Sequence, residues 1–404
     1  MPQPVLTPAI REEIARLERA DIMVGIPSFK NATTIGYVVR AAQAGLVQFF
    51  PDLRPVVVNS DAGSPDGTQR VVVETEPPDY VERILLVRPT NKLRRVSLTY
   101  PEVNGSGGKG AALRTIFEMA AALEVQALVV VDSDLRSIGP EWIELLAGPI
   151  LKGGYDYVAP LYARHKHDGT ITNSIAYPLT RALYGFRIRQ PIGGEFGFHA
   201  DLARAYLAQP VWESDVARFG IDIFMTTTAI ARGARVAQAF LGAKVHDPKD
   251  PAADLGPMFT QVVGTLFRMA ADNEAMWSKV KGSKDVPVIG DPMPVEPEAI
   301  PADPARLREK YTAAKGAHEA RWREILSAPV PDKLDAKMWA RFVFDHLDAA
   351  LRKPTESEPL ARSLLPLYQL RTATFIEEVR DMTTAQSETV VEDGARVMEE
   401  EKRR

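Results

Sequence analysis

The chain has 404 residues, which by length alone is enough for two or three domains. Its 49 basic and 53 acidic side chains give a net charge of −4, which argues against a protein that coats nucleic acid. The sequence has no cysteine, which excludes disulfides, thiol nucleophiles and thiolate metal sites. No apolar run approaches the roughly 20 residues that span a bilayer, and residues 1–20 predict a polar leader and a helix rather than a secretion signal. We therefore expect a soluble cytoplasmic protein without a membrane or nucleic-acid partner.

Short β-branched runs alternate with helical patterns over residues 21–270, which is typical of a mostly parallel α/β sheet. The runs are continuously apolar, as expected for strands that are buried on both faces. Strands are predicted at residues 22–26, 55–58, 83–87, 127–131, 155–161 and 235–241, and helices at 34–48, 67–74, 110–123, 140–151, 175–184 and 221–232.

The strand signals stop near Met258, and the rest of the chain has a different composition. Residues 286–304 carry six prolines, which excludes a helix or a central strand and predicts an extended linker. Further helices are predicted at 260–271, 305–328, 333–352 and 356–382, and residues 399–404 are expected to fray. The predicted organisation is a leader and helix (1–20), an α/β domain (21–270), a proline-rich strap (271–304) and a helical C-terminal domain (305–404).

The strongest candidate for chemistry is Asp132-Ser133-Asp134, which directly follows a predicted buried strand. Open α/β sheets bind ligands at the carboxyl ends of their strands. Two carboxylates spaced two residues apart on an extended segment both reach that edge, and they suit a hard divalent cation with its bound phosphates. An isolated pair of this kind is a weak signal, and an acidic turn that caps the next helix is the structural alternative.

Three more loops are expected at the same edge of the sheet. Residues 27–31 follow the first strand, residues 59–68 follow the second, and Gly107-Gly108-Lys109-Gly110 opens the helix before the Asp132 strand. Glycine backbone beside a lysine at a helix N-terminus suits the approach of an anion, although such a run alone is more often a tight loop. The spacing of a P-loop is absent.

With these motifs in order, the sequence resembles the retaining, nucleotide-sugar-dependent glycosyltransferases of the GT-A fold. More narrowly, it resembles the enzymes that make glucosylglycerate, mannosylglycerate and glucosyl-3-phosphoglycerate. The resemblance covers residues 22–267 and implies a Rossmann-like, mostly parallel GT-A domain followed by a helical domain. The shared motifs are Gly108-Lys109-Gly110, Asp132-Ser133-Asp134, Gln190-Pro191-Ile192-Gly193-Gly194-Glu195, Gly220-Ile221-Asp222 and Lys244-Val245-His246.

The resemblance implies where a metal ion and the donor bind. It assigns the metal to Asp134 and His246, a donor pair that suits Mg²⁺, Mn²⁺ or Co²⁺. Apart from the resemblance, His246 is better explained as a satisfied histidine that closes a strand. Asp132 would contact the ribose or the sugar, Asp61 the base or the ribose, and Lys109 a phosphate or the base side of the pocket. The implied donor-binding residues are Pro27, Ser28, Phe29, Lys30, Asp61, Lys109, Asp132 and Ser133.

Glu195 and Asp222 are placed by the resemblance around the donor sugar, and with Lys109 they are the catalytic candidates. Gly193 and Gly194 would leave room for the sugar to approach the backbone. Structural alternatives remain for both acids: an ion pair between Glu195 and a nearby arginine, and a favourable interaction of Asp222 with the start of its helix.

The acceptor site is expected in the loop after the strand at 155–161. Arg164 offers two donors to a carboxylate, and Thr172 adds a hydroxyl group at a helix start. The spacing of Arg164, Asp168 and Thr172 resembles the glycerate site of the mannosylglycerate enzymes, whereas the enzymes that use 3-phosphoglycerate carry arginine at the position of Thr170. One alternative is that the charge for a phosphorylated acceptor comes from His165, Lys166 or His167. The other is that this segment is only a mobile basic surface loop. The predicted acceptor-binding residues are Arg164, Asp168, Gly169, Thr170 and Thr172.

The predicted function is metal-dependent transfer of glucose, with retention, from a nucleotide diphosphate to the 2-hydroxyl of D-glycerate, as in compatible-solute synthesis. No residue is identified as a covalent nucleophile, so attack from the face that the diphosphate leaves is preferred. The alternatives within the fold are transfer from GDP-mannose and use of 3-phosphoglycerate. A nucleotidyltransferase, whose usual glycine-rich first loop is missing, and a non-catalytic sugar-nucleotide-binding protein are the rivals from other classes. Apolar aromatic residues in the C-terminal helices also predict a homo-oligomer, a dimer or a tetramer.

Overall fold

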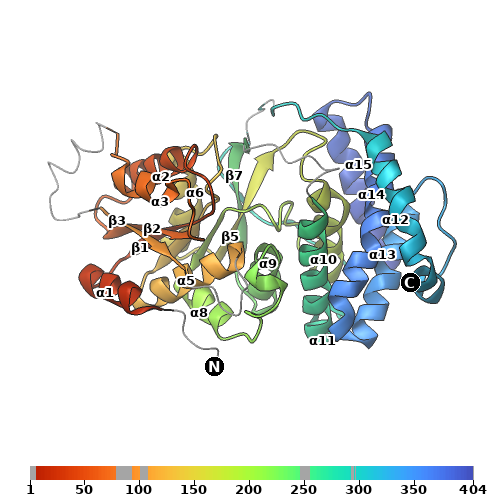
Figure 1. Cartoon of the computed structure of the whole chain (residues 1–404), viewed down its shortest axis with the longest axis horizontal. Coiled ribbons are helices and arrows are strands. Elements are labelled where there is room, and N and C mark those ends of the chain that lie inside the picture. The colour runs from red at the N-terminus through yellow and green to blue at the C-terminus, as the bar shows by residue number, and fades with distance from the viewer. Residues whose placement is uncertain are drawn as a thin grey trace.

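The structure is a computed structural model that describes residues 6–78, 93–100, 108–245, 255–292, 295 and 297–403. Within these residues, a mixed sheet of eight strands has the order β3-β2-β1-β4-β6-β5-β7-β8 (Figure 1). All pairings are parallel except those of β6, which runs antiparallel to both β4 and β5. The strands are β1 (Ile22–Ser28), β2 (Pro55–Asp61), β3 (Arg94–Thr99), β4 (Ala127–Val130), β5 (Tyr157–Ala163), β6 (Phe196–His199), β7 (Val236–Ala243) and β8 (Val288–Ile289).

The central strands are continuously apolar because helices cover both faces of the sheet. One face packs on α2 (Ile35–Phe49) and α6 (Pro140–Leu151). The other face packs on α5 (Lys109–Ala122), with α8 (Ala200–Leu207) and α9 (Ile221–Ala231) beside it. The predicted α/β class is therefore confirmed.

Most of the predicted strands are confirmed within a few residues, but the edge and the middle of the sheet differ from the prediction. The predicted strand at 83–87 lies outside the described residues. The strand next to β2 is β3 (Arg94–Thr99), a polar segment that the apolar patterns did not identify. The short reversed strand β6 was also missed, because four residues carry too little pattern to stand out.

The C-terminal part is a set of packed helices (Figure 1). The predicted linker contains a short helix and one short strand, β8, which extends the sheet beside β7. Several helices begin with an acid or a threonine that accepts from the helix backbone, as at Asp303, Asp335 and Thr383. The remaining helices are α1 (Pro8–Leu17), α3 (Thr68–Glu74), α7 (Tyr177–Tyr184), α10 (Leu255–Asp272), α11 (Glu274–Trp277), α12 (Pro304–Ile325), α13 (Ala336–Arg352), α14 (Ser357–Glu378) and α15 (Thr384–Lys402).

The expectation that residues 399–404 fray is wrong for the described residues. Helix α15 continues to Lys402, because its last turn is fixed to the rest of the molecule. Glu399 pairs with Arg181 of α7 at 2.5 Å, and Lys402 Nζ donates to the carbonyl oxygens of Trp277 and Val280, each at 2.8 Å.

One hydrophobic core runs from the α5 face of the sheet into the C-terminal helices, and it includes Phe117, Phe267, Phe342 and Leu364. Helix α10 lies between the two parts and packs on α9 as well as on α14 (Figure 1). In the described part of the chain, no helix combines the length and the apolar character that crossing a membrane requires.

Candidate active site

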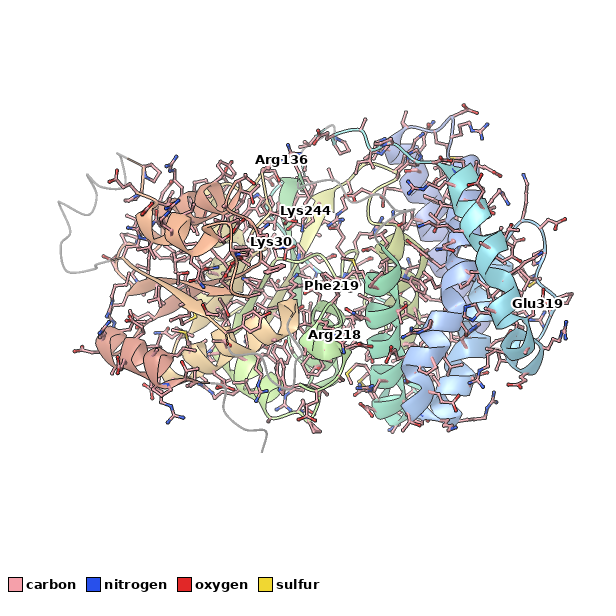
Figure 2. The ribbon with its side chains drawn as sticks, viewed as in Figure 1. Lys30, Arg136, Arg218, Phe219, Lys244 and Glu319 are labelled. Atoms are coloured by element: carbon pink, nitrogen blue, oxygen red, sulfur yellow. The ribbon has the colours of Figure 1, made fainter. Side chains whose placement is uncertain are left out.

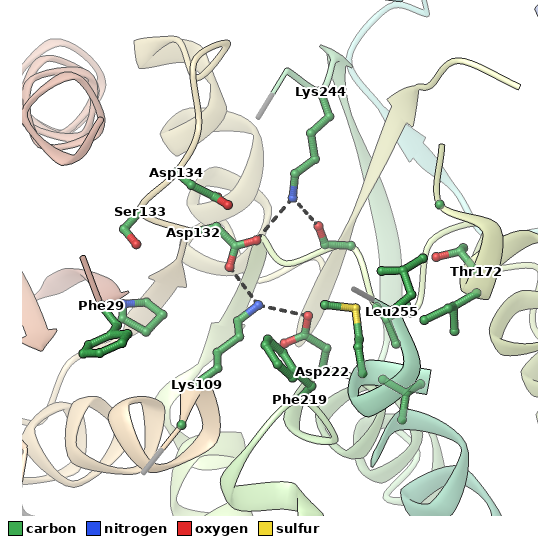
Figure 3. Close-up of a pocket in the computed structure, with 18 of the residues that line it drawn as sticks. Phe29, Lys109, Asp132, Ser133, Asp134, Thr172, Phe219, Asp222, Lys244 and Leu255 are labelled. Atoms are coloured by element: carbon green, nitrogen blue, oxygen red, sulfur yellow. Dashed lines mark hydrogen bonds and ion pairs between the residues drawn. The ribbon is translucent and has the colours of Figure 1, made fainter. Parts of the chain in front are cut away.

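A cavity of about 680 Å³ opens where the carboxyl ends of β1, β4, β5 and β7 face helix α10. Figure 3 shows its charged centre, and Figure 2 shows Lys244 and Phe219 between the sheet and the C-terminal helices. The polar side of the cavity comes from the loops after the strands, and an apolar wall comes from Leu255, Met258 and Val262 of α10. This cavity therefore lies at the edge of the sheet where the sequence predicted the site.

Two lysines and two carboxylates, Asp132 and Asp222, form a connected network at the centre of this cavity (Figure 3), and the buried carboxylate of Glu195 joins it from behind. Lys109 Nζ lies 2.8 Å from Asp132 Oδ1 and 3.0 Å from Asp222 Oδ2. Lys244 Nζ lies 3.3 Å from Asp132 Oδ2 and 2.8 Å from Glu195 Oε2, and it donates to the carbonyl oxygen of Gly193 at 2.7 Å. Asp132 thus bridges the two lysines.

Burial shapes the protonation of this network. Burial opposes charge on Lys109, but Asp132 and Asp222 outweigh it and raise the pKa of the lysine, so Lys109 is a cation. Burial also raises the pKa of Asp222, although Lys109 opposes this shift. One carboxylate oxygen of Asp222, Oδ1, is buried without a hydrogen-bond partner among the described residues. Within the described part of the chain, that oxygen is the carboxylate oxygen of the network that lacks a partner.

Glu195 lies behind the cavity wall and is fully buried. Burial raises its pKa to about 7 against the opposing effect of Lys244, and the charge of Asp132 adds to the rise. The hydroxyl of Tyr162 donates to Glu195 Oε2, and burial raises the pKa of this phenol well above its ordinary value. Glu195 pairs with Lys244 rather than with the nearby arginines, and whether it bonds a sugar stays a prediction.

Two glycines of the predicted motifs allow other parts of the chain to pack closely against them. Gly194 has φ +100°, and a Cβ there would lie 2.3 Å from Asp132 Oδ2. A Cβ at Gly110 would lie 1.8 Å from the carbonyl oxygen of Val216, so only glycine lets the start of α5 reach that segment. The Gly110 backbone N–H donates to the Arg218 carbonyl there at 3.1 Å. These glycines position Asp132 and Lys109.

Asp134 lines the cavity on the other side of the Asp132–Ser133–Asp134 turn (Figure 3). Its carboxylate has no hydrogen-bond or ion-pair partner among the described residues. Ser133 fixes the turn, because its hydroxyl donates to Asn31 Oδ1 at 2.8 Å and its carbonyl accepts from Thr34 at 2.8 Å. His246, the other predicted metal ligand, lies outside the described residues. Within those residues, no group of three or more His, Cys, Asp or Glu side chains forms a metal-binding cluster.

The structure brings most, but not all, of the predicted donor-binding residues to the cavity. Pro27, Ser28, Phe29, Lys109, Asp132 and Ser133 line it. Phe29 is 52% exposed, with Lys30 Nζ 5.0 Å from its ring centre, but Lys30 does not line the cavity. Asp61 is fully buried and accepts from Ser28 Oγ at 2.6 Å and from Ser64 Oγ at 2.7 Å. Its position therefore favours holding the loops after β1 and β2 together over contact with the donor.

All five predicted acceptor-binding residues line the cavity: Arg164, Asp168, Gly169, Thr170 and Thr172. Arg164 Nη1 lies 3.3 Å from Asp168 Oδ2, and its guanidinium lies 5.6 Å from the ring centre of Tyr162. Thr170 begins a helical segment that passes through the π-helix Thr172–Ala176 into α7, so the helix predicted at 175–184 starts earlier. The loop presents one guanidinium and a helix start to the cavity.

The neighbouring basic residues are occupied elsewhere. Lys166 Nζ donates to the carbonyls of Val379, Arg380 and Met382 at 2.7–2.8 Å, beyond the end of α14. His165 Nδ1 accepts from the backbone N–H of Ile300 at 3.3 Å and does not line the cavity. His167 does line the cavity, but burial lowers its pKa, so it is mostly neutral at pH 7. The alternative in which these residues bind a phosphate is not favoured by this arrangement.

Several residues at the site were missed by sequence reasoning. Lys244 stands in a motif that was recognised, but no role was predicted for it. Tyr162 and Phe219 adjoin recognised motifs and had no pattern of their own. Tyr368 contacts Thr170 from 198 positions further along the chain, a pairing for which the sequence carries no signal.

Comparison with known proteins identifies relatives of this chain. Residues 83–266 match the family model described as mannosylglycerate synthase, GT domain. The curated glucosyl-3-phosphoglycerate synthase of Petrotoga mobilis is 24% identical over 280 residues, which cover 64% of this chain and 77% of that protein. The family model and this relative confirm the resemblance predicted from the motifs, and residues 83–266 are similar to the glycosyltransferase domain of this group.

Solved structures of glucosyl-3-phosphoglycerate synthase from Mycobacterium tuberculosis are also similar. One, in complex with Mn²⁺, UDP and glucosyl-3-phosphoglycerate, is 28% identical, covers 63% of this chain and 83% of its own, and has a TM-score of 0.46. Another, with Mn²⁺, UDP-glucose and phosphoglyceric acid, is 26% identical, covers 66% and 85%, and has a TM-score of 0.47.

Proposed function

We propose that this protein is a retaining glucosyltransferase that moves glucose from a nucleotide diphosphate to the 2-hydroxyl of D-glycerate. The observation that carries the choice of acceptor is the single available guanidinium of the acceptor loop. The guanidinium of Arg164 can donate two hydrogen bonds to one carboxylate, and glycerate has one carboxylate. Among the described residues, Arg164 is paired with one carboxylate, that of Asp168, and its Nε has no hydrogen-bond partner. Lys109 and Lys244, the two lysines that line the cavity, each contact two carboxylates.

A phosphorylated acceptor lacks a partner in this arrangement. The hydroxyl of Thr170, where the 3-phosphoglycerate enzymes carry arginine, lies 2.6 Å from the hydroxyl of Tyr368. Lys166 faces the end of α14 and His167 is mostly neutral at pH 7. Among the described residues, the phosphate of 3-phosphoglycerate would thus find no cation beyond the one that binds the carboxylate, at a cost in desolvation.

The charge of the cavity also supports a divalent cation. Among its described lining residues, four carboxylates (Asp132, Asp134, Asp168 and Asp222) face three cations (Lys109, Arg164 and Lys244). This lining alone would repel a diphosphate. The carboxylate of Asp134, which has no partner among the described residues, is the hard oxygen donor that Mg²⁺ and Mn²⁺ prefer, and His246 is its proposed companion. A bound cation would neutralise the charge that develops on the leaving diphosphate.

Side chains of the protein would supply positive charge beside the donor and would hold the acceptor and the sugar. Lys109, cationic beside Asp132 and Asp222, adds positive charge next to the donor site. Arg164 would hold the acceptor carboxylate, and Thr172 at its helix start would orient the acceptor for attack from the face that the diphosphate leaves. Asp222, whose Oδ1 has no partner among the described residues, is available to accept a hydrogen bond from a hydroxyl group of the sugar.

The test is a matrix of donors and acceptors measured by release of the nucleotide. Purified protein with Mg²⁺ or Mn²⁺ is given UDP-, ADP- or GDP-glucose, or GDP-mannose, with D-glycerate or 3-phosphoglycerate. We expect a glucose donor and D-glycerate to give the highest kcat/KM. Arg164→Ala should lower kcat/KM for glycerate at least about tenfold, because it removes a charge-assisted contact of roughly 1.5–3 kcal/mol. Arg323→Ala, an exposed arginine on α12, is the matched control and should change nothing.

Two other outcomes of this matrix would support a different acceptor or a different donor. The name of the Petrotoga relative, glucosyl-3-phosphoglycerate synthase, supports 3-phosphoglycerate as the alternative acceptor. A wild-type preference for that acceptor would overturn our assignment. A preference for GDP-mannose would instead agree with the mannosylglycerate synthase model matched by residues 83–266.

A further inference from the structure

We propose that Tyr368 of α14 is a positioning residue for the acceptor, acting through the hydroxyl of Thr170, so that the C-terminal helices complete the acceptor site. This inference rests on the proposed function in one respect: it takes residues 164–172 as the acceptor loop. It does not depend on which acid the loop binds.

The contact between the two hydroxyl groups is short and dry. Thr170 Oγ1 and the Tyr368 hydroxyl lie 2.6 Å apart, and the residues are 3% and 1% exposed. Burial raises the pKa of Tyr368 to about 12, so the phenol keeps its proton at neutral pH. A buried hydroxyl that loses its partner carries the full cost of desolvation, so this pair restrains the loop.

Tyr368 also supports the opposite wall of the cavity. Its ring stacks on Phe259 of α10, with ring centres 4.4 Å apart and planes inclined by 25°. Phe259 follows Met258, which lines the cavity, and Thr170 lines it from the loop side. One side chain of the helical part therefore contacts both the acceptor loop and the helix that faces it.

Other contacts fasten the loop to the same helices. Lys166 donates to three carbonyls just beyond the end of α14, where the helix dipole favours a cation. Trp339 of α13 donates from Nε1 to the carbonyl of Ser174 at 2.7 Å, within the π-helix that begins at Thr172. A π-helix leaves some carbonyls without their usual partners, and such segments often mark functional sites. Arg164 and Asp168 line the cavity, whereas Lys166 contacts the helical part.

The loops that form the donor side of the cavity follow β1 and β4, and within the described part of the chain Tyr368 has no hydrogen bond or ring contact with either of them. Loss of its hydroxyl should therefore affect acceptor binding and leave donor binding unchanged. That asymmetry separates positioning of the acceptor from a general loss of structure.

The experiment compares Tyr368→Phe with wild type, using whichever acceptor the wild type turns over. The phenyl ring can still stack on Phe259, so only the hydroxyl is lost. We expect the acceptor KM to rise about 3- to 10-fold, as for loss of one buried hydrogen bond, with the donor KM unchanged. Tyr206→Phe is the matched control: this buried tyrosine of α8 donates to the Met225 carbonyl at 3.1 Å and does not line the cavity, so its variant should keep the wild-type acceptor KM.

A double variant tests whether the effect passes through Thr170. Thr170→Val should raise the acceptor KM, and Tyr368→Phe combined with Thr170→Val should raise it little further. An unchanged acceptor KM in Tyr368→Phe, additive effects in the double variant, or an equal rise in donor KM would each overturn the inference. Failure of the proposed function looks different, because it shows in the wild type itself, which would then prefer 3-phosphoglycerate or turn over neither acid.

Discussion

At the scale of single residues, the two aspartates of one motif do different work. Asp132 bridges Lys109 and Lys244, so its charge is balanced within the protein. Asp134, two residues later, faces the cavity without a partner among the described residues. The same side chain thus serves structure at one position and is available to a ligand at the other.

We predict opposite profiles for the two asparagine variants. Asp134→Asn should lower kcat/KM at least about 100-fold and raise the concentration of Mg²⁺ or Mn²⁺ needed for half-maximal activity, while the melting temperature stays near that of wild type. Asp132→Asn should lower the stability by roughly 1–3 kcal/mol, because two buried lysines lose part of their shared partner. Metal titrations of activity and urea unfolding measure both effects. Equal destabilisation by the two variants would contradict this division of roles.

The sequence predicted which residues gather at the cavity better than it predicted what they contact. Asp132, Asp134 and Arg164 follow buried strands of one sheet, and the carboxyl ends of parallel strands meet at one edge. Asp61 was expected to face the donor for the same reason. In the structure it accepts hydrogen bonds from two loops, because a carboxylate at the end of a buried strand also suits backbone and serine donors, and its contact with the donor stays a prediction.

At the scale of elements, the start of α5 shows why a glycine-rich motif can be structural. Gly110 permits the closest approach in that region, to the Val216 carbonyl in the segment before α9. The approach brings Lys109, at the first position of α5, to Asp222, near the start of α9. The motif therefore sets the distance between two helices that carry residues of the site.

Gly110→Ala should separate these two helices. A methyl group there meets backbone rather than a flexible side chain, so we expect a loss of about 1–3 kcal/mol in unfolding free energy and a loss of activity. Gly316→Ala on α12 is the matched control, since its Cβ would meet nothing within 4 Å. That change should stabilise the protein by about 0.5–1 kcal/mol through helix propensity, with normal activity. The prediction is wrong if both variants shift the unfolding midpoint in the same direction.

Helices with strong periodic patterns were predicted well, whereas elements set by long-range contacts were not. Helix α6 (Pro140–Leu151) was predicted to the residue. Helix α15 was missed, because its stability comes from contacts with Arg181, Trp277 and Val280, which are more than 100 positions away. The π-helix at Thr172–Ala176 likewise has a distant partner, because Trp339 of α13 donates to the Ser174 carbonyl within it.

At the scale of the whole molecule, the C-terminal helices and the sheet share one hydrophobic core. Trp339 and Phe342, two of the aromatic residues from which a homo-oligomer was predicted, are buried inside the chain itself. The oligomer stays a prediction, without that argument in its favour. The shared core also means that the two parts should unfold together.

His346 of α13 offers a way to test this cooperativity. It is fully buried, its Nδ1–H donates to the Phe342 carbonyl at 2.7 Å, and Nε2 lies 3.0 Å from Ser363 Oγ of α14. Burial lowers the pKa of His346 to about 4, and nearby Arg321 and His318 of α12 also disfavour its charge. Because the folded state holds the histidine neutral, its contribution is present above pH 6.5, the ordinary histidine pKa, and is lost as pH falls toward 4.

Acidification from pH 7.5 to pH 5 should therefore cost wild type on the order of 2 kcal/mol relative to His346→Gln, which cannot titrate. Comparing the two proteins cancels groups that shift the other way, such as Glu195, whose raised pKa favours the folded state as pH falls. Urea unfolding is followed by far-ultraviolet circular dichroism and by loss of activity at each pH. Because the core is shared, we expect both signals to move together, although His346 lies among the C-terminal helices. Loss of helicity at acidic pH while activity persists would show that the two parts unfold separately.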